Sequence, residues 1–300
     1  GDIDALPIEE VTGLPFSSCK KGVMHACGHD AHGAMALGTA LILNDMRSRL
    51  HGTAKIIFQE AEETMFGALH VLESGLIDDC DNSIMLHVAV DHDTGVFLVN
   101  YGVRCAKVGS CKIFIDGRAG HSSRPEQAVN PIIIASKIID AIADITAYEL
   151  PRSEYVVFSP TVIKSGTKEN IIPGSCYIEA NARYFDDKFD EFLSRRITEI
   201  SENIARAMGG SAKVEFTPEG TPMINDDAST ERAINIIKRL WGEDKIDYTP
   251  PGLFGDDFAF IQKRFPGVVV NLGAAKDGKY TIGHNEHMMV DENCMDIGVE

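Results

Sequence analysis

The chain has 300 residues, of which 44% are hydrophobic and 24% charged, an ordinary composition for a soluble globular protein with room for two domains. Its formal net charge is −17, and such an acidic surface repels phosphate backbones, so we expect no nucleic-acid partner.

Seven scattered cysteines argue against a disulfide framework and favour the reducing cytoplasm. No apolar stretch is long enough to span a membrane, so we expect no membrane as a partner. No signal peptide is visible, and the first residue is Gly1 rather than Met, so we expect a fragment or trimmed chain.

Strands and helices alternate over the first part of the chain. Apolar spacing and turn residues predict a short strand at 1–8, a helix at 30–50, a buried strand at 53–59, a helix at 62–74 and another buried strand at 83–88. This alternation favours a layered α/β domain.

The middle of the chain has a different order. Alternating and helical patterns predict, in sequence, a strand at 107–117, a helix at 127–146, strands at 155–163 and 176–185, a helix at 189–208 and a strand at 212–216. This β-α-β-β-α-β order is that of the ferredoxin-like motif. The α/β pattern then resumes with helices at 229–240 and 256–264, a buried strand at 268–272 and a closing loop and helix at 281–300.

The strongest chemical signal is the segment M-H-A-C-G-H-D-A-H at residues 24–32. It places one thiol and three imidazoles at the start of a predicted helix, and both groups suit zinc and its neighbours. Gly28 allows the tight backbone by which Cys27 and His29 can converge. The alternative is a structural zinc knuckle or a set of core histidines.

Three weaker signals follow. Glu62 and Glu63 open a predicted helix, where one carboxylate can bind metal while the other acts as a general base; the alternative is an acidic first turn that complements the helix dipole. His87 ends an apolar strand, where a lone histidine is more often structural. His284 and His287 lie in a polar loop, G-H-N-E-H at 283–287.

Together these segments resemble the metal-dependent amidohydrolases, a group that includes hippurate hydrolases, aminoacylase-like enzymes, indole-acetyl-amino-acid hydrolases and N-acetyldiaminopimelate deacetylases. Residues 24–32 match the group's M-H-A-C-G-H-D-A-H motif, and residues 59–63 are similar to its Q-P-A-E-E. The other matches, in order along almost the whole chain, are D-x-D-A-L-P at 2–7, L-H-V at 86–88, G-x-x-G-H-x-x-x-P at 117–125, N-x-I-P at 170–173 and G-x-E/D-D-F at 255–258.

The resemblance implies a zinc-exopeptidase-like catalytic domain with a layered α/β sheet, built from residues 1–103 and 219–300. It implies that residues 104–218 form an inserted ferredoxin-like α+β domain that acts as a lid and joins two copies in a homodimer. Two divalent metal ions per subunit are expected, zinc or manganese first and cobalt or nickel as alternatives. The implied substrate is an N-acyl-amino acid, hippurate-like or N-acetylated, cleaved to a carboxylic acid and an amino acid.

The resemblance also implies roles for single residues. Glu62 would be the general base, and His121 would reach into the partner subunit's site and hold the substrate carbonyl. Asn170 and Arg183 would contact the substrate's carboxylate, and Asp257 would bind substrate close to the metals. The expected metal ligands are Cys27, His29, Glu63, His87 and His284.

Two departures from the family pattern leave alternatives open. Glu60 stands where relatives usually carry Pro, and the loop H-N-E-H makes His287 a rival of His284 as the last ligand. The rival functions are a metallo-dipeptidase or carboxypeptidase of the same chemistry, a non-catalytic protein that binds acyl-amino acids or metal, and a structural zinc domain. The presence of both Glu62 and Glu63 argues against a binder, which needs no base.

Overall fold

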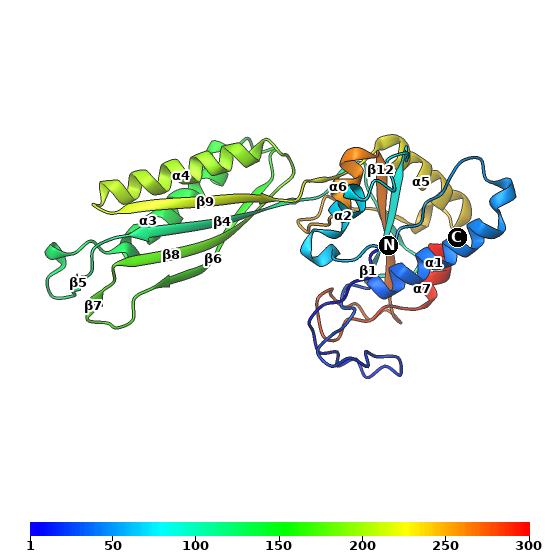
Figure 1. Ribbon diagram of the computed structural model, residues 1–300, viewed down its shortest axis with the longest axis horizontal. Coiled ribbons are helices and arrows are strands. Elements are labelled where there is room, and N and C mark those ends of the chain that lie inside the picture. The colour runs from blue at the N-terminus through cyan, green and yellow to red at the C-terminus, as the bar shows by residue number, and fades with distance from the viewer. The chain divides into compact units, whose positions relative to one another are not determined.

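The computed structural model describes residues 1–300 and divides into two compact units. Unit 1 comprises Gly1–Arg104, Met223–Gly252 and Asp256–Glu300, and unit 2 comprises Cys105–Pro222 and Leu253–Gly255. Figure 1 shows both units as mixtures of helices and strands. None of the helices combines the length and the apolarity that a membrane crossing requires.

A mixed four-stranded sheet with the order β1-β12-β2-β11 forms the centre of unit 1. β1 and β12 run parallel and place His87 directly opposite Asn271. Every residue of β12 is buried, which explains its almost continuous apolar sequence, as expected for an inner strand that is covered on both faces. The strands of the sheet are β1 (Ser83–Asp93), β2 (Phe97–Val99), β11 (Ile246–Tyr248) and β12 (Gly267–Ala275), and a separate pair joins β3 (Gly102–Cys105) to β10 (Met223–Asn225).

Helices pack against this sheet and supply one shared core. Met35 of α1, Ile234 of α5 and Cys294 of α7 are buried together with Val270 and Leu272 of β12. The helices of unit 1 are α1 (His29–Asp45), α2 (Gly67–Glu73), α5 (Asp227–Leu240), α6 (Phe258–Arg264) and α7 (Asn293–Val299), with single turns at Arg47–Arg49, Glu62–Thr64 and Glu243–Lys245.

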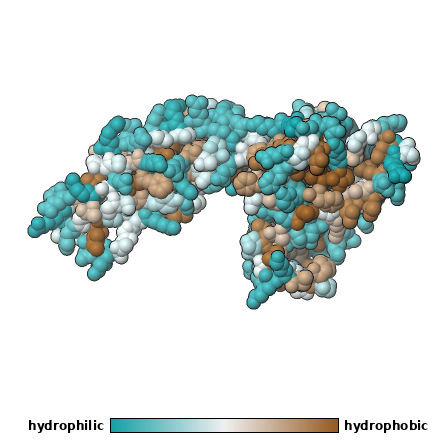
Figure 2. Space-filling view, viewed as in Figure 1, coloured by the Kyte–Doolittle hydropathy of each residue, from teal (hydrophilic) through white to brown (hydrophobic).

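The exposed side of α1 is also apolar. Leu37 is 52% and Leu41 61% exposed, whereas Ala31 and Met35 of the same helix are buried. Apolar residues gather on the face of unit 1 that Figure 2 shows. Because α1 is apolar on more than one side, its sequence lacks the single apolar stripe of an amphipathic surface helix.

Unit 2 has a ferredoxin-like fold. Its antiparallel sheet has the order β6-β8-β4-β9, and alternate residues of β8 are buried. The buried residues, such as Ile178, pack with Ile134 of α3 and Leu193 of α4, so both helices cover the same face of the sheet. The elements are β4 (Lys107–Asp116), α3 (Pro131–Asp144), β6 (Val156–Ser165), β8 (Ser175–Tyr184), α4 (Phe189–Ala207) and β9 (Ser211–Glu219), with the small pair β5 (Gly120–His121) and β7 (Ile171–Ile172) and turns at Pro125–Gln127 and Ile145–Glu149.

The expected fold class, a layered α/β sheet with a ferredoxin-like insertion, is confirmed, but the buried strand expected at 53–59 is wrong. Only Gln59 forms a bridge, with Asp2, and Phe58 is 46% exposed. The segment lies beside the first residues of the chain, since Gln59 N–H donates to the carbonyl of Gly1. Short apolar runs do not reveal how many sides of a strand are covered. Residues 1–8, also expected as a strand, form only isolated bridges at Asp2 and Leu6.

The single helix expected at 62–74 is interrupted. Met65 has φ 62° and ends the turn Glu62–Thr64, and α2 begins at Gly67. A Cβ on Gly67 would lie 1.8 Å from the carbonyl oxygen of Glu60, so only glycine allows the chain to fold back this closely. The interruption places the two glutamates on a turn of their own rather than on a helix face.

Other differences concern element ends. α1 ends at Asp45, before the expected residue 50, and α6 begins at Phe258 rather than 256. The short strands β2, β3, β5, β7, β10 and β11 had no sequence signal, because two to four residues are too few to display a period.

Candidate active site

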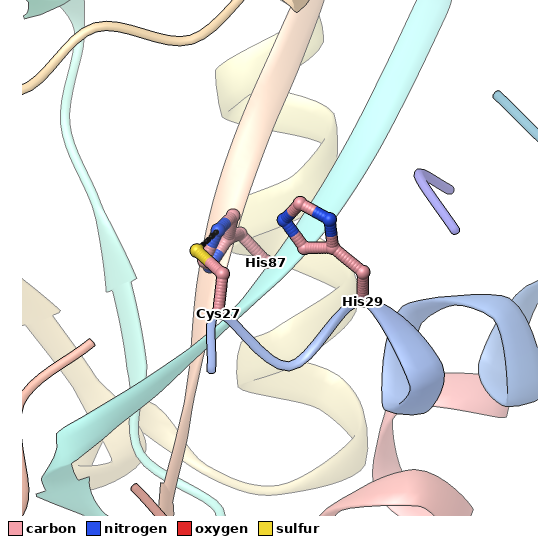
Figure 3. A group of neighbouring side chains, drawn as sticks. All are labelled: Cys27, His29 and His87. Carbon is pink, nitrogen blue, oxygen red and sulfur yellow. Dashed lines mark hydrogen bonds between the residues drawn. The ribbon is translucent and has the colours of Figure 1, made fainter. Parts of the chain in front are cut away.

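Cys27 and His29 reach the same place from the turn before α1. Gly28 between them has φ 87°, and a Cβ there would lie 2.4 Å from Cγ2 of Val88, so the turn requires glycine. His87 arrives from β1, and its Nε2 lies 3.6 Å from Sγ of Cys27 (Figure 3). The ligand atoms of Cys27, His29 and His87 all lie within 4.8 Å of one another, as a metal site requires.

A second group of ligand atoms shares Cys27 with the first. It combines Cys27, Glu63 and His284 within the same 4.8 Å limit, and Nε2 of His284 lies 3.2 Å from Oε1 of Glu63. His284 has φ 59°. The rival His287 belongs to no such group, and its side chain is 66% exposed beside Glu286. Of the two histidines, the structure brings His284 to the other expected ligands.

The imidazoles of His29 and His87 use Nδ1 for their hydrogen bonds to oxygen, which leaves each Nε2 turned toward the ligand cluster. Nδ1 of His29 lies 3.0 Å from Oδ1 of Asp4, and Nδ1 of His87 lies 2.7 Å from the carbonyl of Val88. Both contacts require N–H on Nδ1, so each Nε2 carries a lone pair directed at the cluster. Nε2 of His29 is buried and has no hydrogen bond, and buried Oε1 of Glu63 has only its 3.2 Å contact with His284, which lacks hydrogen-bond geometry.

Unsatisfied buried acceptors destabilise a protein unless something pairs with them. A divalent cation would pair with both atoms, and the thiol, imidazole and carboxylate donors match the preferences of zinc and its neighbours. The residues present therefore fit a metal site.

Asp4 was not among the expected site residues, yet it contacts two ligands. Its Oδ1 accepts from His29, and its Oδ2 accepts from the backbone N–H of Glu63 at 3.1 Å. The only sequence signal was its place in the D-x-D segment. Asp256 was also missed: it is 5% exposed and lies within ligand distance of Glu62 and Asp257.

Burial, and then the negative charge of neighbouring groups, raises the pKa values of the acids in this cluster. Burial, followed by repulsion from Asp256 and Asp257, raises the pKa of Glu62 to about 10. Burial raises the pKa of Asp256 to about 7. Burial and then the charge of Glu63 raise the pKa of the Cys27 thiol. Acids gathered in this way without a matching cation mark a functional site and attract metal ions.

Asp257, expected to contact substrate, has a different environment. It is 1% exposed, its Oδ1 accepts from Gln59 at 2.7 Å, and its Oδ2 accepts from the backbone N–H of Ala68 at 2.8 Å. Both oxygens are therefore occupied inside unit 1. The carboxylate thus joins the segment before Glu62 to α2, while its ligand distance to Glu62 and Asp256 keeps it beside the cluster; its contact with a substrate stays a prediction.

The other three expected residues lie in unit 2. His121 is exposed on β5, and its Nδ1 accepts from the backbone N–H of Ser123 at 3.2 Å. Its proton is therefore on Nε2, which points away from this contact. Asn170 adjoins it, because its carbonyl accepts from the N–H of Ser122 at 3.1 Å.

Arg183 lies at the other end of the same unit. β8 begins at Ser175, next to the turn that follows β7, and Arg183 is its penultimate residue. At about 3.3 Å per residue the two ends of this strand are separated by roughly 25–30 Å. Figure 1 shows β5 and β7 together at one end of the sheet of unit 2. Within one chain, Arg183 and Asn170 cannot contact the same small substrate.

The fold and the ligand groups define a metal-dependent hydrolase of amide bonds. The chain belongs to peptidase family M20/M25/M40, whose profile matches residues 1–300. It is 33% identical over 296 residues to the N-acetylcysteine deacetylase of Bacillus subtilis (strain 168), with 99% of this chain and 77% of the relative covered. It is also 33% identical over 302 residues to thermostable carboxypeptidase 1 of Saccharolobus solfataricus, with 99% and 76% covered.

A solved structure supports the same assignment. The Bacillus subtilis YXEP protein, described as a dinuclear metal binding peptidase from the M20 family, superposes with a TM-score of 0.85. The identity is 31%, over 99% of this chain and 76% of that chain. The resemblance to the metal-dependent amidohydrolases and the expectation of an enzyme are thereby confirmed.

Proposed function

We propose that this protein hydrolyses the amide bond of N-acyl-amino acids and releases a carboxylic acid and an amino acid. The observation that carries the proposal is the convergence of a thiol, three imidazoles and Glu63 beside the buried carboxylate of Glu62. Relatives named N-acetylcysteine deacetylase and N-acetyldiaminopimelate deacetylase support the substrate class.

Two divalent ions per subunit complete the proposal. Cys27 belongs to both ligand groups, one with His29 and His87 and the other with Glu63 and His284, and these five side chains would hold the two ions. The structural relative described as dinuclear supports this count. Zinc or manganese is the first choice, with cobalt or nickel as alternatives. Bound ions would polarise the amide carbonyl and lower the pKa of water.

Glu62 is the proposed general base, and bound cations would lower its pKa by offsetting the negative charge around it. Its Oε2 lies 3.9 Å from Nε2 of His29, so the carboxylate adjoins the ligand cluster. As water attacks the carbonyl carbon, Glu62 takes its proton and then passes it to the leaving nitrogen while the C–N bond breaks. Glu63 is the ligand of the pair, because its Oε1 faces His284.

His121 is proposed to stabilise the oxyanion of a site in the partner subunit. Its Nε2–H is exposed and free to donate, because Ser123 occupies Nδ1. The separation of Arg183 from Asn170 supports a composite site: a carboxylate held by both needs Arg183 from one chain and Asn170 from another. We therefore propose a homodimer joined through unit 2.

The cellular setting is also a proposal. None of the seven cysteines takes part in a disulfide, which favours the reducing cytoplasm. The net charge of −17 favours a small-molecule substrate over nucleic acid.

A panel of substrates with metal reconstitution tests the proposal. The protein is stripped with a chelator, reloaded with zinc or manganese, and assayed on N-acetyl-amino acids, hippurate and blocked dipeptides while bound metal is counted. We expect two exchangeable ions and hydrolysis of the acyl-amino acids. Two ions without turnover would indicate a binding protein, and a single tightly held ion would indicate a structural zinc domain.

The same panel of substrates tests the second candidate function. Thermostable carboxypeptidase 1 is as similar to this chain as the deacetylase is, so a carboxypeptidase is the alternative. Preferential cleavage of the blocked dipeptides would favour it.

A further inference from the structure

We propose that Asp2 and His32 are a positioning pair for His87 and act through the backbone of Val88. The inference rests on the proposed function, in which His87 is a metal ligand. Neither Asp2 nor His32 has a part in the chemistry described above, and both are buried, with 5% and 3% exposure.

Three hydrogen bonds connect the pair to the ligand. Nδ1 of His32 lies 2.5 Å from Oδ1 of Asp2. The backbone N–H of Val88 donates to Nε2 of His32 at 2.9 Å. Nδ1–H of His87 donates to the carbonyl of the same Val88 at 2.7 Å. The path from Asp2 to the ligand is therefore continuous and buried.

The protons of His32 follow from these contacts. Because Nε2 accepts from Val88, the ring proton is on Nδ1 and is donated to the carboxylate of Asp2. Both ring nitrogens are thus occupied. His32 is therefore not free to bind metal, although its ligand atom lies close to those of Asp2 and His29.

Val88 depends on these contacts because of its place in the sheet. β1 is an edge strand, paired only with β12. The N–H and C=O of Val88 point to the same side of the strand, and each is bonded to an imidazole rather than to a neighbouring strand. His32 thereby holds the residue whose carbonyl sets the tautomer and ring plane of His87.

The rings also touch. The centroids of His32 and His87 are 4.4 Å apart at an interplanar angle of 62°, so the ring of His32 limits the tilt of the ligand. Loss of the acceptor on His32 would leave a buried N–H of Val88 unpaired, and the peptide would then be free to shift together with His87.

Two substitutions at position 32 separate the two halves of the path. In H32Q an amide oxygen can replace Nε2 as the acceptor for Val88, while the donor to Asp2 is lost. In H32N the amide nitrogen can replace Nδ1 as the donor to Asp2, while Val88 loses its acceptor. D2N keeps the size of Asp2 and removes its charge.

The measurements are the affinity for zinc by chelator competition, the visible spectrum of the cobalt-substituted protein, and the melting temperature without metal. We expect H32N to lower zinc affinity by roughly 10–100-fold and to shift the cobalt bands, with a smaller effect of H32Q and D2N. H92Q is the matched control. Nδ1 of His92 lies 2.8 Å from Oδ1 of Asp91, and neither residue is a proposed ligand. This variant should match the wild type in all three measurements.

Wild-type zinc affinity and cobalt spectrum in folded H32N would overturn the positioning role even if its melting temperature fell. Equal losses in H32N and H32Q would also overturn it, because they would indicate direct ligation by His32. If the wild type binds and hydrolyses normally, such results leave the proposed function intact. If H87A binds metal as the wild type does, the ligand assignment fails and the positioning role fails with it.

Discussion

Oδ1 of Asp4 lies 3.0 Å from Nδ1 of His29, so this carboxylate fixes the tautomer of a proposed metal ligand. The other oxygen of Asp4 holds the backbone N–H of Glu63. One side chain thus connects the turn before α1 with the turn that carries the two glutamates, two segments that are more than thirty residues apart in the sequence.

Replacing Asp4 with alanine should therefore weaken metal binding without removing a ligand. We expect zinc affinity to fall by about 10–100-fold, because the ring of His29 and the turn of Glu63 both lose their anchor. Chelator competition measures the change. D30A is the control, since Asp30 is exposed in the first turn of α1 and its Oδ1 accepts from the backbone N–H of Ala31. An unchanged affinity in D4A would contradict the anchoring role.

The adjacent glutamates should separate chemistry from binding. E62Q should keep a normal metal content and lower kcat by about 10²–10⁴, because the proton acceptor is lost. E63Q should lower the metal content as well. Metal analysis and steady-state kinetics on both variants check this. Full turnover in E62Q would refute the base assignment.

Mixed dimers should reveal the composite site. H121A and E62Q should each be nearly inactive alone, whereas a heterodimer of the two should recover about half of the activity per dimer. One of its two sites combines an intact Glu62 with an intact His121 from the other chain. Differently tagged subunits, purified through both tags, provide the sample. Verified heterodimers without recovered activity would count against catalysis across subunits.

The free energy of unfolding of unit 2 should fall at alkaline pH. Burial alone would lower the pKa of Lys107, but hydrogen bonds to Asp190 and Asp187 outweigh it and raise the pKa. Burial and the bond to Asp190 raise the pKa of Tyr184. Above pH 10 the folded chain keeps protons that the unfolded chain has lost, so the free energy of unfolding falls as pH rises. The slope is at most about 1.4 kcal/mol per pH unit for each group.

Urea titrations at pH 8 and 10.5 measure this effect. Y184F should lose about 1 kcal/mol at pH 8, for its hydrogen bond to Asp190, and should show a shallower alkaline decline than the wild type. Y148F is the control, because Tyr148 is 83% exposed. An identical alkaline slope in Y184F and the wild type would contradict the assignment.

Several parts of this protein were predictable from its residues alone. The ferredoxin-like order of unit 2 follows from the spacing of its apolar residues. They recur about every two residues in long strands such as β4 and about every three and a half residues in long helices such as α4. The density of thiol and imidazole at 24–32 indicated a metal site before any geometry, because few other sites need so many ligand types in one turn. Glu62 and Glu63 were identifiable only in combination with that signal.

Tertiary structure decided the rest. The family resemblance favours His284 over its rival His287, but only the backbone of their loop brings His284 to Glu63. His32 and His29 share a motif, yet the N–H of Val88, from a distant strand, occupies the ligating nitrogen of one and leaves that of the other free. Local sequence determines which chemical groups are available. The direction of each lone pair depends on contacts between distant segments, and these form only when the chain is packed.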